Sequence, residues 1–290
     1  IKDIKPIVDT VIEQLEYARN SASVSTKQMD VIFTPEGVGS AFVPSLISAF
    51  SGKTVLQGAS PIGKNLGEEI FDESLSLYDD PLIDYAANSR PCDDEGVPSR
   101  KTPLIENGVV CNFLYDLQTA GLAGKASTGN AHRIRGGLVA PSPSTFVFNT
   151  GKSNLKDMIS NIEEGLIIEQ LMGAEQGNIM GGDFSGNVLL GYKIENGKII
   201  GRVKNTMIAG NVYKILKDIA AMSKEGKWVD GYLYTPYIFC HNISVASKAC
   251  SGCRVRIDHP AWCARHSKKT GNVYAWSRGT EHITSPWFYC

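Results

Sequence analysis

The 290-residue sequence lacks the features that identify membrane and secreted proteins. No uninterrupted apolar run approaches the ~18 residues that a membrane-spanning helix requires, and residues 1–6 do not resemble a secretory signal. The first 249 residues contain only three cysteines, Cys92, Cys111 and Cys240, which are widely spaced. Such sparse cysteine use argues against a disulfide-stapled domain, so we expect a cytoplasmic protein with reduced thiols and no membrane association.

An excess of charge of either sign is also missing, because 29 Lys and Arg are balanced by 30 Asp and Glu. The balanced total is the sum of two segments with net charges of opposite sign. Residues 1–249 carry a net charge of −5, whereas residues 250–290 carry +4 and hold four of the seven cysteines. An acidic domain has no electrostatic attraction for nucleic acid, so we expect no nucleic-acid partner. The composition predicts one domain over residues 1–249 and an atypical tail over residues 250–290.

The tail contains the one spacing in the sequence that is typical of a metal site. Cys250, Cys253, Cys263 and His266 form a C-x2-C-x9-C-x2-H pattern, although zinc ribbons use a longer central spacer. A zinc knuckle, an unrelated extension and an out-of-frame tail all remain open interpretations. The first residue is Ile1 and not Met, from which we expect that a further N-terminal region belongs to the protein.

Hydrophobic periodicity predicts short amphipathic helices mixed with antiparallel strands. Asn-Gly pairs at 107–108 and 196–197 each stand between β-prone runs, which is a strong hairpin signal. The fold class is therefore α+β, with mixed, antiparallel-rich sheets and a few helices. Helices are expected over residues 4–19, 35–50 with a kink or delay at Pro44, 155–162 and 212–222, and strands over 29–33, 166–168 and 235–245, with Pro236 limiting the start of the last.

Three segments are dense in Gly and short polar residues: 93–97, 127–132 and 181–187. Each is compatible with an ordinary turn whose side chains bond to the local backbone. Asp93, Asp94 and Glu95 are consecutive, so their carboxylates point in different directions in a regular structure and are ill placed to share a cation. We expect them to fix a loop by accepting backbone N–H groups.

The order of these segments resembles that in the TldD/PmbA family. An Asp-Asp-Glu-Gly box precedes the first Asn-Gly pair, followed by Ser-Thr-Gly-Asn, Gly-Asp-Phe-Ser-Gly, the second Asn-Gly pair and Thr-Met-Ile-Ala-Gly-Asn at 206–211. Leu66-Gly67-Glu68, Asp79-Asp80-Pro81 and Leu171-Met172-Gly173 agree as well. The resemblance covers about residues 31–247 and implies the C-terminal, protease-related domain of the family.

One segment separates the two branches of that family. The TldD-like branch has a His-Glu-x-x-x-His helix that holds zinc and activates water for peptide hydrolysis. Residues 39–50 stand in this place and contain no His, Glu or Cys, and Pro44 would disturb the helix. The resemblance therefore implies the PmbA, or TldE, branch, with no catalytic residue, metal or cofactor in this chain and with zinc in a TldD-like partner subunit.

Five residues are candidates for binding a peptide substrate. Asp183 and Ser185, with Gly182 allowing close backbone approach, could line a groove that offers main-chain hydrogen bonds as in strand addition. Asn130 and His132 lie in the second polar segment. A lone histidine is more often structural than catalytic.

Three functions remain open at this stage. The first is a non-catalytic subunit of a heteromeric metallopeptidase that processes unstructured or modified peptides. The second is a self-sufficient metallohydrolase with unrecognised ligands such as His132 and the carboxylate box. The third is a regulatory binding module, because the family is also named for modulation of DNA gyrase. The assembly is open between a heteromer and a homodimer.

Overall fold

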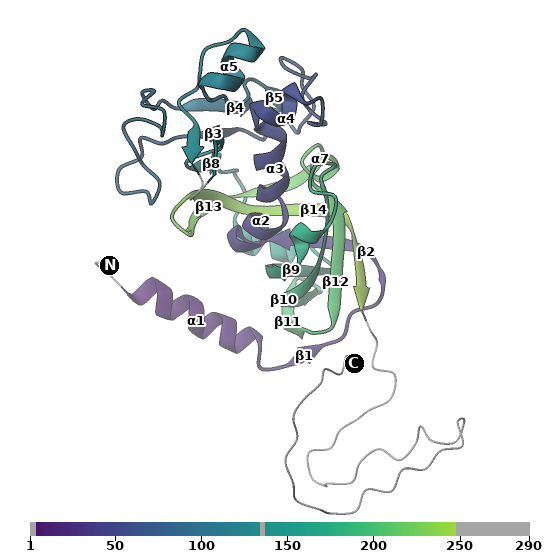
Figure 1. Ribbon diagram of the computed structural model, residues 1–290. Coiled ribbons are helices and arrows are strands. Elements are labelled where there is room, and N and C mark those ends of the chain that lie inside the picture. Colours follow the sequence, from purple (N-terminus) through teal and green to yellow (C-terminus); the bar gives the residue numbers. More distant parts are fainter. Residues whose placement is uncertain (1–3, 134–136, 248–290) are drawn as a thin grey trace, which may run out of the picture. The chain divides into compact units, whose positions relative to one another are not determined.

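The computed structural model describes residues 4–133 and 137–247, and residues 1–249 form one compact unit (Figure 1). The Cys and His pattern of the tail lies outside the described residues. The helices are α1 Lys5–Tyr17, α2 Pro35–Ala41, α3 Val43–Phe50, α4 Gly52–Leu56, α5 Leu117–Ala123, α6 Leu155–Ser160 and α7 Val212–Ile215, with a 3₁₀ turn η1 at Ala174–Gln176. The strands are β1 Ser21–Ala22, β2 Lys27–Phe33, β3 Leu77–Asp79, β4 Thr102–Glu106, β5 Val109–Val110, β6 Ala131–Arg133, β7 Val139–Pro141, β8 Phe146–Phe148, β9 Glu164–Met172, β10 Asp183–Glu195, β11 Lys198–Val203, β12 Thr206–Asn211, β13 Ile219–Val229 and β14 Leu233–Ser247.

Most strands of the described residues join one twelve-stranded mixed sheet. Its central strands pair in the order β10–β9–β2–β14–β12 and back to β10, so they close into a barrel-like arrangement. The β2–β9 pair is parallel, and the other four pairs are antiparallel. Closure leaves these strands without a free edge over the paired residues. Together with the seven helices this arrangement confirms the α+β fold class.

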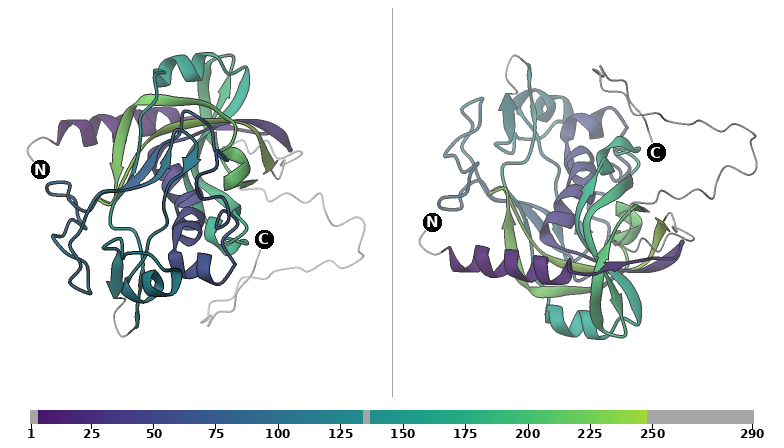
Figure 2. Two further views of the ribbon diagram at one scale, coloured as in Figure 1. Left: turned by 90° about the horizontal axis from the view of Figure 1, so that it is seen from above. Right: turned by 90° about the horizontal axis from the view of Figure 1, so that it is seen from below.

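The barrel strands are buried on two faces. The larger core joins inward residues of β2, β9 and β14 to the apolar side of α2 and α3, where Phe42, Leu46 and Phe50 are fully buried. A smaller core on the other face gathers around Tyr192 and is covered by α6 and the end of α1. In both views of Figure 2, α1 runs along the strands apart from the paired helices α2 and α3. Helix α3 thus lies against the larger core, and one side of it remains available to a cavity.

Local signals predicted several elements correctly. Both Asn-Gly pairs form the expected hairpins, between β4 and β5 and between β10 and β11, and all four residues have positive φ. The Thr34 side chain accepts a hydrogen bond from the Gly37 N–H and so caps α2. The expected break at Pro44 is also present, because α2 ends at Ala41 and Pro44 lies in the first turn of α3.

Two predictions about the C-terminal part were wrong. The helix expected over residues 212–222 ends at Ile215, and Ile219 already belongs to β13. Pairing of β13 with the long strand β14 outweighs the weak helical periodicity of this segment. Pro236 does not limit the start of β14, which begins at Leu233. The register shift between Met222 and Gly226 accommodates the proline opposite Gly226.

Helix α1 has the predicted span, but its aliphatic side is not buried. Ile7, Val11, Ile12 and Leu15 are between 48% and 65% exposed. The helix contacts the sheet through its other side, where Tyr17 packs edge-on against Tyr192 at a ring-centroid distance of 5.4 Å. The amphipathic pattern therefore predicted the helix correctly and its buried face incorrectly.

Candidate functional site

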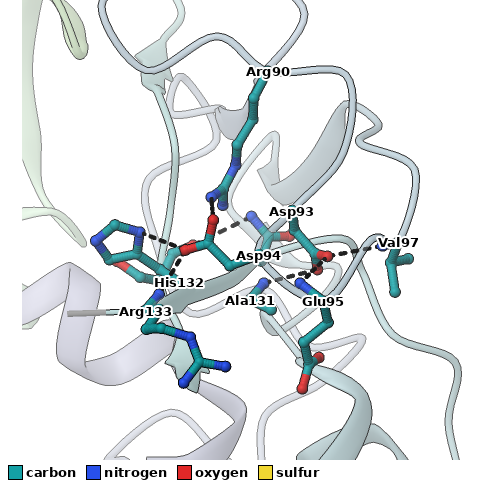
Figure 3. A network of polar contacts seen from close by, with 10 residues as sticks. Arg90, Asp93, Asp94, Glu95, Val97, Ala131, His132 and Arg133 are labelled. Atoms are coloured by element: carbon teal, nitrogen blue, oxygen red, sulfur yellow. Dashed lines mark hydrogen bonds and ion pairs between the residues drawn. The ribbon is translucent and has the colours of Figure 1, made fainter. Parts of the chain in front are cut away.

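The three consecutive carboxylates hold three different backbone segments, and Figure 3 shows the contacts of Asp93 and Asp94. Asp93 accepts hydrogen bonds from the N–H groups of Glu95, Val97 and Ala131, at 2.9–3.0 Å. Asp94 accepts one from the Arg133 N–H at 2.6 Å, and Glu95 accepts one from the Leu117 N–H at 2.7 Å, at the start of α5. The expectation that this box fixes a loop is confirmed.

Asp94 also contacts the side chains of Arg90 and His132. Its carboxylate lies 3.7 Å from the Arg90 guanidinium and 3.4 Å from His132 Nδ1 (Figure 3). The pKa of Asp94 is lowered, chiefly by the hydrogen bond from the Arg133 backbone and further by the charges of Arg90 and His132. Asp94 therefore stays ionised and orients the imidazole of His132, which is half exposed. This pair positions His132 at the surface.

Asn130 faces inward, away from solvent. Its side chain is 1% exposed, and its amide donates a 2.6 Å hydrogen bond to Asp79, which is fully buried. The Asp79 carboxylate also accepts the N–H groups of Ser144 and Thr145, both at 2.7 Å. Burial raises the pKa of Asp79 to about 6, although all these hydrogen bonds oppose the increase. Asn130 thus fixes the loop at residues 142–145, and a direct contact with substrate is not open to it in this conformation.

A cavity of about 450 Å³ lies between this loop and α3. Val43 and Ile47 of α3 and Phe146 of β8 form its apolar wall, and Arg90 and His132 belong to its polar wall. Further lining residues are Asn88, Ser89, Ser142, Pro143, Ser144 and Tyr232. An apolar wall opposite a few polar groups is the usual composition of a small-molecule or peptide site. We therefore take this cavity, defined by these residues and named the α3 cavity, as the candidate site.

The other three candidate residues lie at the start of β10. Gly182 has φ +82°, and a Cβ there would lie 2.4 Å from the Tyr213 ring. The exposed Asp183 accepts a 2.8 Å hydrogen bond from Asn211, which is its partner in the β10–β12 register. The backbone of β10 from Asp183 pairs with β12, so this side of the strand is not free for strand addition. Ser185 is exposed and lines a separate shallow cavity.

The sequence therefore grouped residues that the structure divides between two places. His132 lines the α3 cavity, with Asn130 behind it, whereas Gly182, Asp183 and Ser185 belong to the barrel. Helix α3 is the link between them. On one side it lines the cavity, and on the other the Ser45 carbonyl accepts a 3.3 Å hydrogen bond from Tyr213, whose ring covers Gly182.

Comparison with known proteins identifies the family. The sequence model of the PmbA/TldA metallopeptidase C-terminal domain matches residues 26–247. The chain belongs to the PmbA/TldD family. The TldE crystal structure from Thermococcus kodakarensis superimposes with a TM-score of 0.75 and 32% identity, over 84% of this chain and 56% of that one. The structure and this family membership agree on the α+β fold.

Curated relatives extend the comparison. An uncharacterized protein of Methanocaldococcus jannaschii is 34% identical over 75% of this chain and 51% of its own length. A metalloprotease TldD homolog of Buchnera aphidicola is 31% identical over 60% of this chain and 36% of its own length. The chain thus spans about half or less of these relatives. Among the described residues, no helix is long and apolar enough to cross a membrane.

The residues of this PmbA/TldD domain do not fit the zinc ion of the TldD branch. Helix α3 belongs to the segment, residues 39–50, where the resemblance led us to expect any zinc ligands, and it contributes Val43 and Ile47 to the cavity. Residues 4–133 and 137–247 contain no group of three or more His, Cys, Asp or Glu side chains arranged to hold a metal. His132 has Asp94 as its one acidic neighbour in the polar network. No metal-dependent step can be assigned to these side chains.

Sequence reasoning missed three residues that shape the site. Arg90 and Tyr232 line the cavity from loops that carry no motif. Asp79 was noted only as part of an Asp-Asp-Pro run, although it organises the loop beneath the cavity. An acidic residue next to an apolar strand was the one available signal, since buried charges require partners.

Proposed function

We propose that this chain is the non-catalytic, PmbA/TldE-type subunit of a two-subunit metallopeptidase that processes or degrades unstructured or modified peptides. The observation that supports the proposal is the cavity side of α3, where Val43 and Ile47 contribute aliphatic side chains and no metal ligand. An aliphatic side chain can neither bind zinc nor activate water. In this proposal a TldD-type partner supplies the zinc, and this chain supplies binding surface.

The walls of the α3 cavity suit an extended peptide segment. Val43, Ile47 and Phe146 offer apolar contacts, while Arg90 and His132 offer polar ones. Asp94 orients His132, and Asp79 with Asn130 stiffens the loop below. A wall that is already rigid loses little conformational entropy of its own when a flexible peptide binds to it. The chain would thus orient a peptide for cleavage by the partner.

Co-expression with a zinc-bearing TldD-type subunit tests the proposal. The two chains should co-purify and cleave an unstructured peptide, and this chain alone should be inactive. Ser142→Trp should fill the cavity and raise the KM of the pair, because Ser142 lines the cavity and its backbone N–H would keep its hydrogen bond to the Asn130 carbonyl. Leu122→Trp, on the exposed side of α5, is the matched control and should leave KM unchanged. Failure of the chains to associate, with a partner fully active alone, would refute the proposal.

The rival functions have their own tests. A self-sufficient metallohydrolase would retain about one equivalent of metal after dialysis, also in a Cys250→Ser/Cys253→Ser variant that removes the tail's contribution. A regulatory module acting on nucleic acid would show salt-sensitive DNA binding. We expect less than about one tenth of an equivalent of metal in the variant, and no such DNA binding.

A further inference from the structure

A second cavity, of about 300 Å³, lies beside β4 and has no part in the proposed peptide site. Its polar lining consists of Arg100, Lys101, Lys125, Thr102, Asn112, Tyr115 and Thr128, and Leu66 and Phe113 contribute to its apolar surface. Among the described residues that line it there are three cations and no Asp or Glu. This excess of positive charge stands out in a chain whose first 249 residues carry −5. We name it the β4 cavity.

Two of the three cations are held in place by neighbours that do not neutralise them. The Lys101 ammonium lies 3.4 Å from the centre of the Tyr78 ring, and this cation–π contact leaves its charge intact. The Arg100 guanidinium donates a hydrogen bond to the Ser127 carbonyl, which is uncharged. Lys125 is exposed just beyond α5. The charges are therefore gathered around one cavity without a counter-ion among its lining residues.

Tyr115 adds a donor from a buried position. Its side chain is only 5% exposed, and it packs so closely on Gly52 that a Cβ there would lie 2.3 Å from the ring. Its hydroxyl has no hydrogen-bond partner among the described residues. It is also not one of the unpartnered polar atoms that are closed to solvent, so a ligand can reach it. Burial raises the pKa of Tyr115, so the hydroxyl keeps its proton at neutral pH. Because Tyr115 lines the basic cavity, its unpaired hydroxyl is a candidate donor for an acceptor bound there.

Phosphate fits this set of donors better than carboxylate does. Carboxylates are recognised best by a free arginine fork, but the Arg100 fork is partly engaged by Ser127. Lysine ammonium groups bind phosphate as point charges. A phosphate monoester carries about −1.5 to −2 charge and three acceptor oxygens, which suits three cations and a hydroxyl. The Phe113 and Tyr115 side chains provide apolar surface for the group that bears the phosphate.

We propose that the β4 cavity binds the phosphate group of a small phosphate monoester, with Lys101, Lys125 and Arg100 as cationic contacts and Tyr115 as hydroxyl donor. The site is separate from the α3 cavity, so it does not depend on the proposed peptidase role. The two cavities are connected along the chain, because Thr128 lines the β4 cavity and His132, four residues later, lines the α3 cavity. An occupied β4 cavity would fix the segment between them.

Calorimetric titration of the full chain with phenyl phosphate tests the proposal, with inorganic phosphate and benzoate as comparison ligands. We expect a Kd below about 1 mM for phenyl phosphate, weaker binding of inorganic phosphate and none of benzoate. Lys125→Glu should weaken phenyl phosphate binding at least about tenfold. Tyr115→Phe should weaken it less, because it removes one donor and keeps the ring.

Lys156→Glu is the matched control, since Lys156 is an exposed lysine on α6 and lines neither cavity. It should leave the Kd unchanged. Lys125→Gln tests the same charge with less perturbation, and circular dichroism checks that each variant is folded. The proposal is overturned by three results: no phenyl phosphate binding, benzoate binding of equal affinity, or equal affinity in the Lys125→Glu and wild-type chains.

Discussion

The Asn130 amide donates a 2.6 Å hydrogen bond to the fully buried carboxylate of Asp79. The two residues are 51 positions apart, and their contact ties the second polar segment to the loop that lines the α3 cavity. It gives Asn130 a positioning role. Asn130→Ala should lower the free energy of unfolding by about 1–3 kcal/mol, because a buried acceptor loses its partner. Urea denaturation would measure the change, and wild-type stability in this variant would contradict it.

The raised pKa of Asp79 predicts a pH-dependent stability. The carboxyl binds its proton more tightly when folded, with a pKa of about 6 against its usual 3.8. The stabilising contribution is therefore complete below about pH 4 and is lost as the pH rises through about 6, for a total of roughly 3 kcal/mol. Stability should fall over this interval on account of Asp79.

Asp79→Asn should remove that part of the pH dependence. The new amide keeps an oxygen for the N–H groups of Ser144 and Thr145, and it can donate to Asn130 Oδ1, which has no partner. Urea denaturation at several pH values would give a flatter curve than in the wild type between about pH 4 and 6. Identical curves would show that Asp79 does not titrate as described.

Gly182 is required for two reasons that a matched pair of variants can separate. Gly182→Ala places a methyl group 2.4 Å from the Tyr213 ring at φ +82°, whereas Gly58→Ala has φ +68° and no atom within 4 Å. Positive φ alone should cost about 1 kcal/mol in Gly58→Ala, and the clash should add about 1–3 kcal/mol in Gly182→Ala. Equal losses of stability by thermal unfolding would contradict the close packing.

The exposed aliphatic side of α1 predicts tolerance to polar substitution. Ile12 is 50% exposed, whereas Leu46 on α3 is fully buried. Ile12→Ser should change the free energy of unfolding by less than about 0.5 kcal/mol, while Leu46→Ala should lower it by about 2–5 kcal/mol. Chemical denaturation of both variants checks the contrast, and a large loss in Ile12→Ser would mean that this side is covered in solution.

Local features were predictable from the sequence, and long-range ones were not. Asn107-Gly108 and Asn196-Gly197 formed hairpins because positive φ is a local requirement. The segment after Ile215 was misassigned because its partner strand, β14, decides its conformation. Arg90 could not be chosen as a site residue, since its place beside Asp94 and the α3 cavity depends on loop packing. The carboxylate box was interpreted correctly because consecutive side chains cannot converge.

The most direct test of the account concerns where peptide hydrolysis takes place. The measurement is the peptidase activity of the co-purified pair in which both histidines of the partner's His-Glu-x-x-x-His helix are replaced by alanine and this chain is unchanged. The side of α3 that faces the cavity carries Val43 and Ile47 and offers no metal ligand, so we predict that activity falls to background while the chains still associate. Activity equal to that of the unmodified pair would contradict it, because this chain would then hold a catalytic centre of its own.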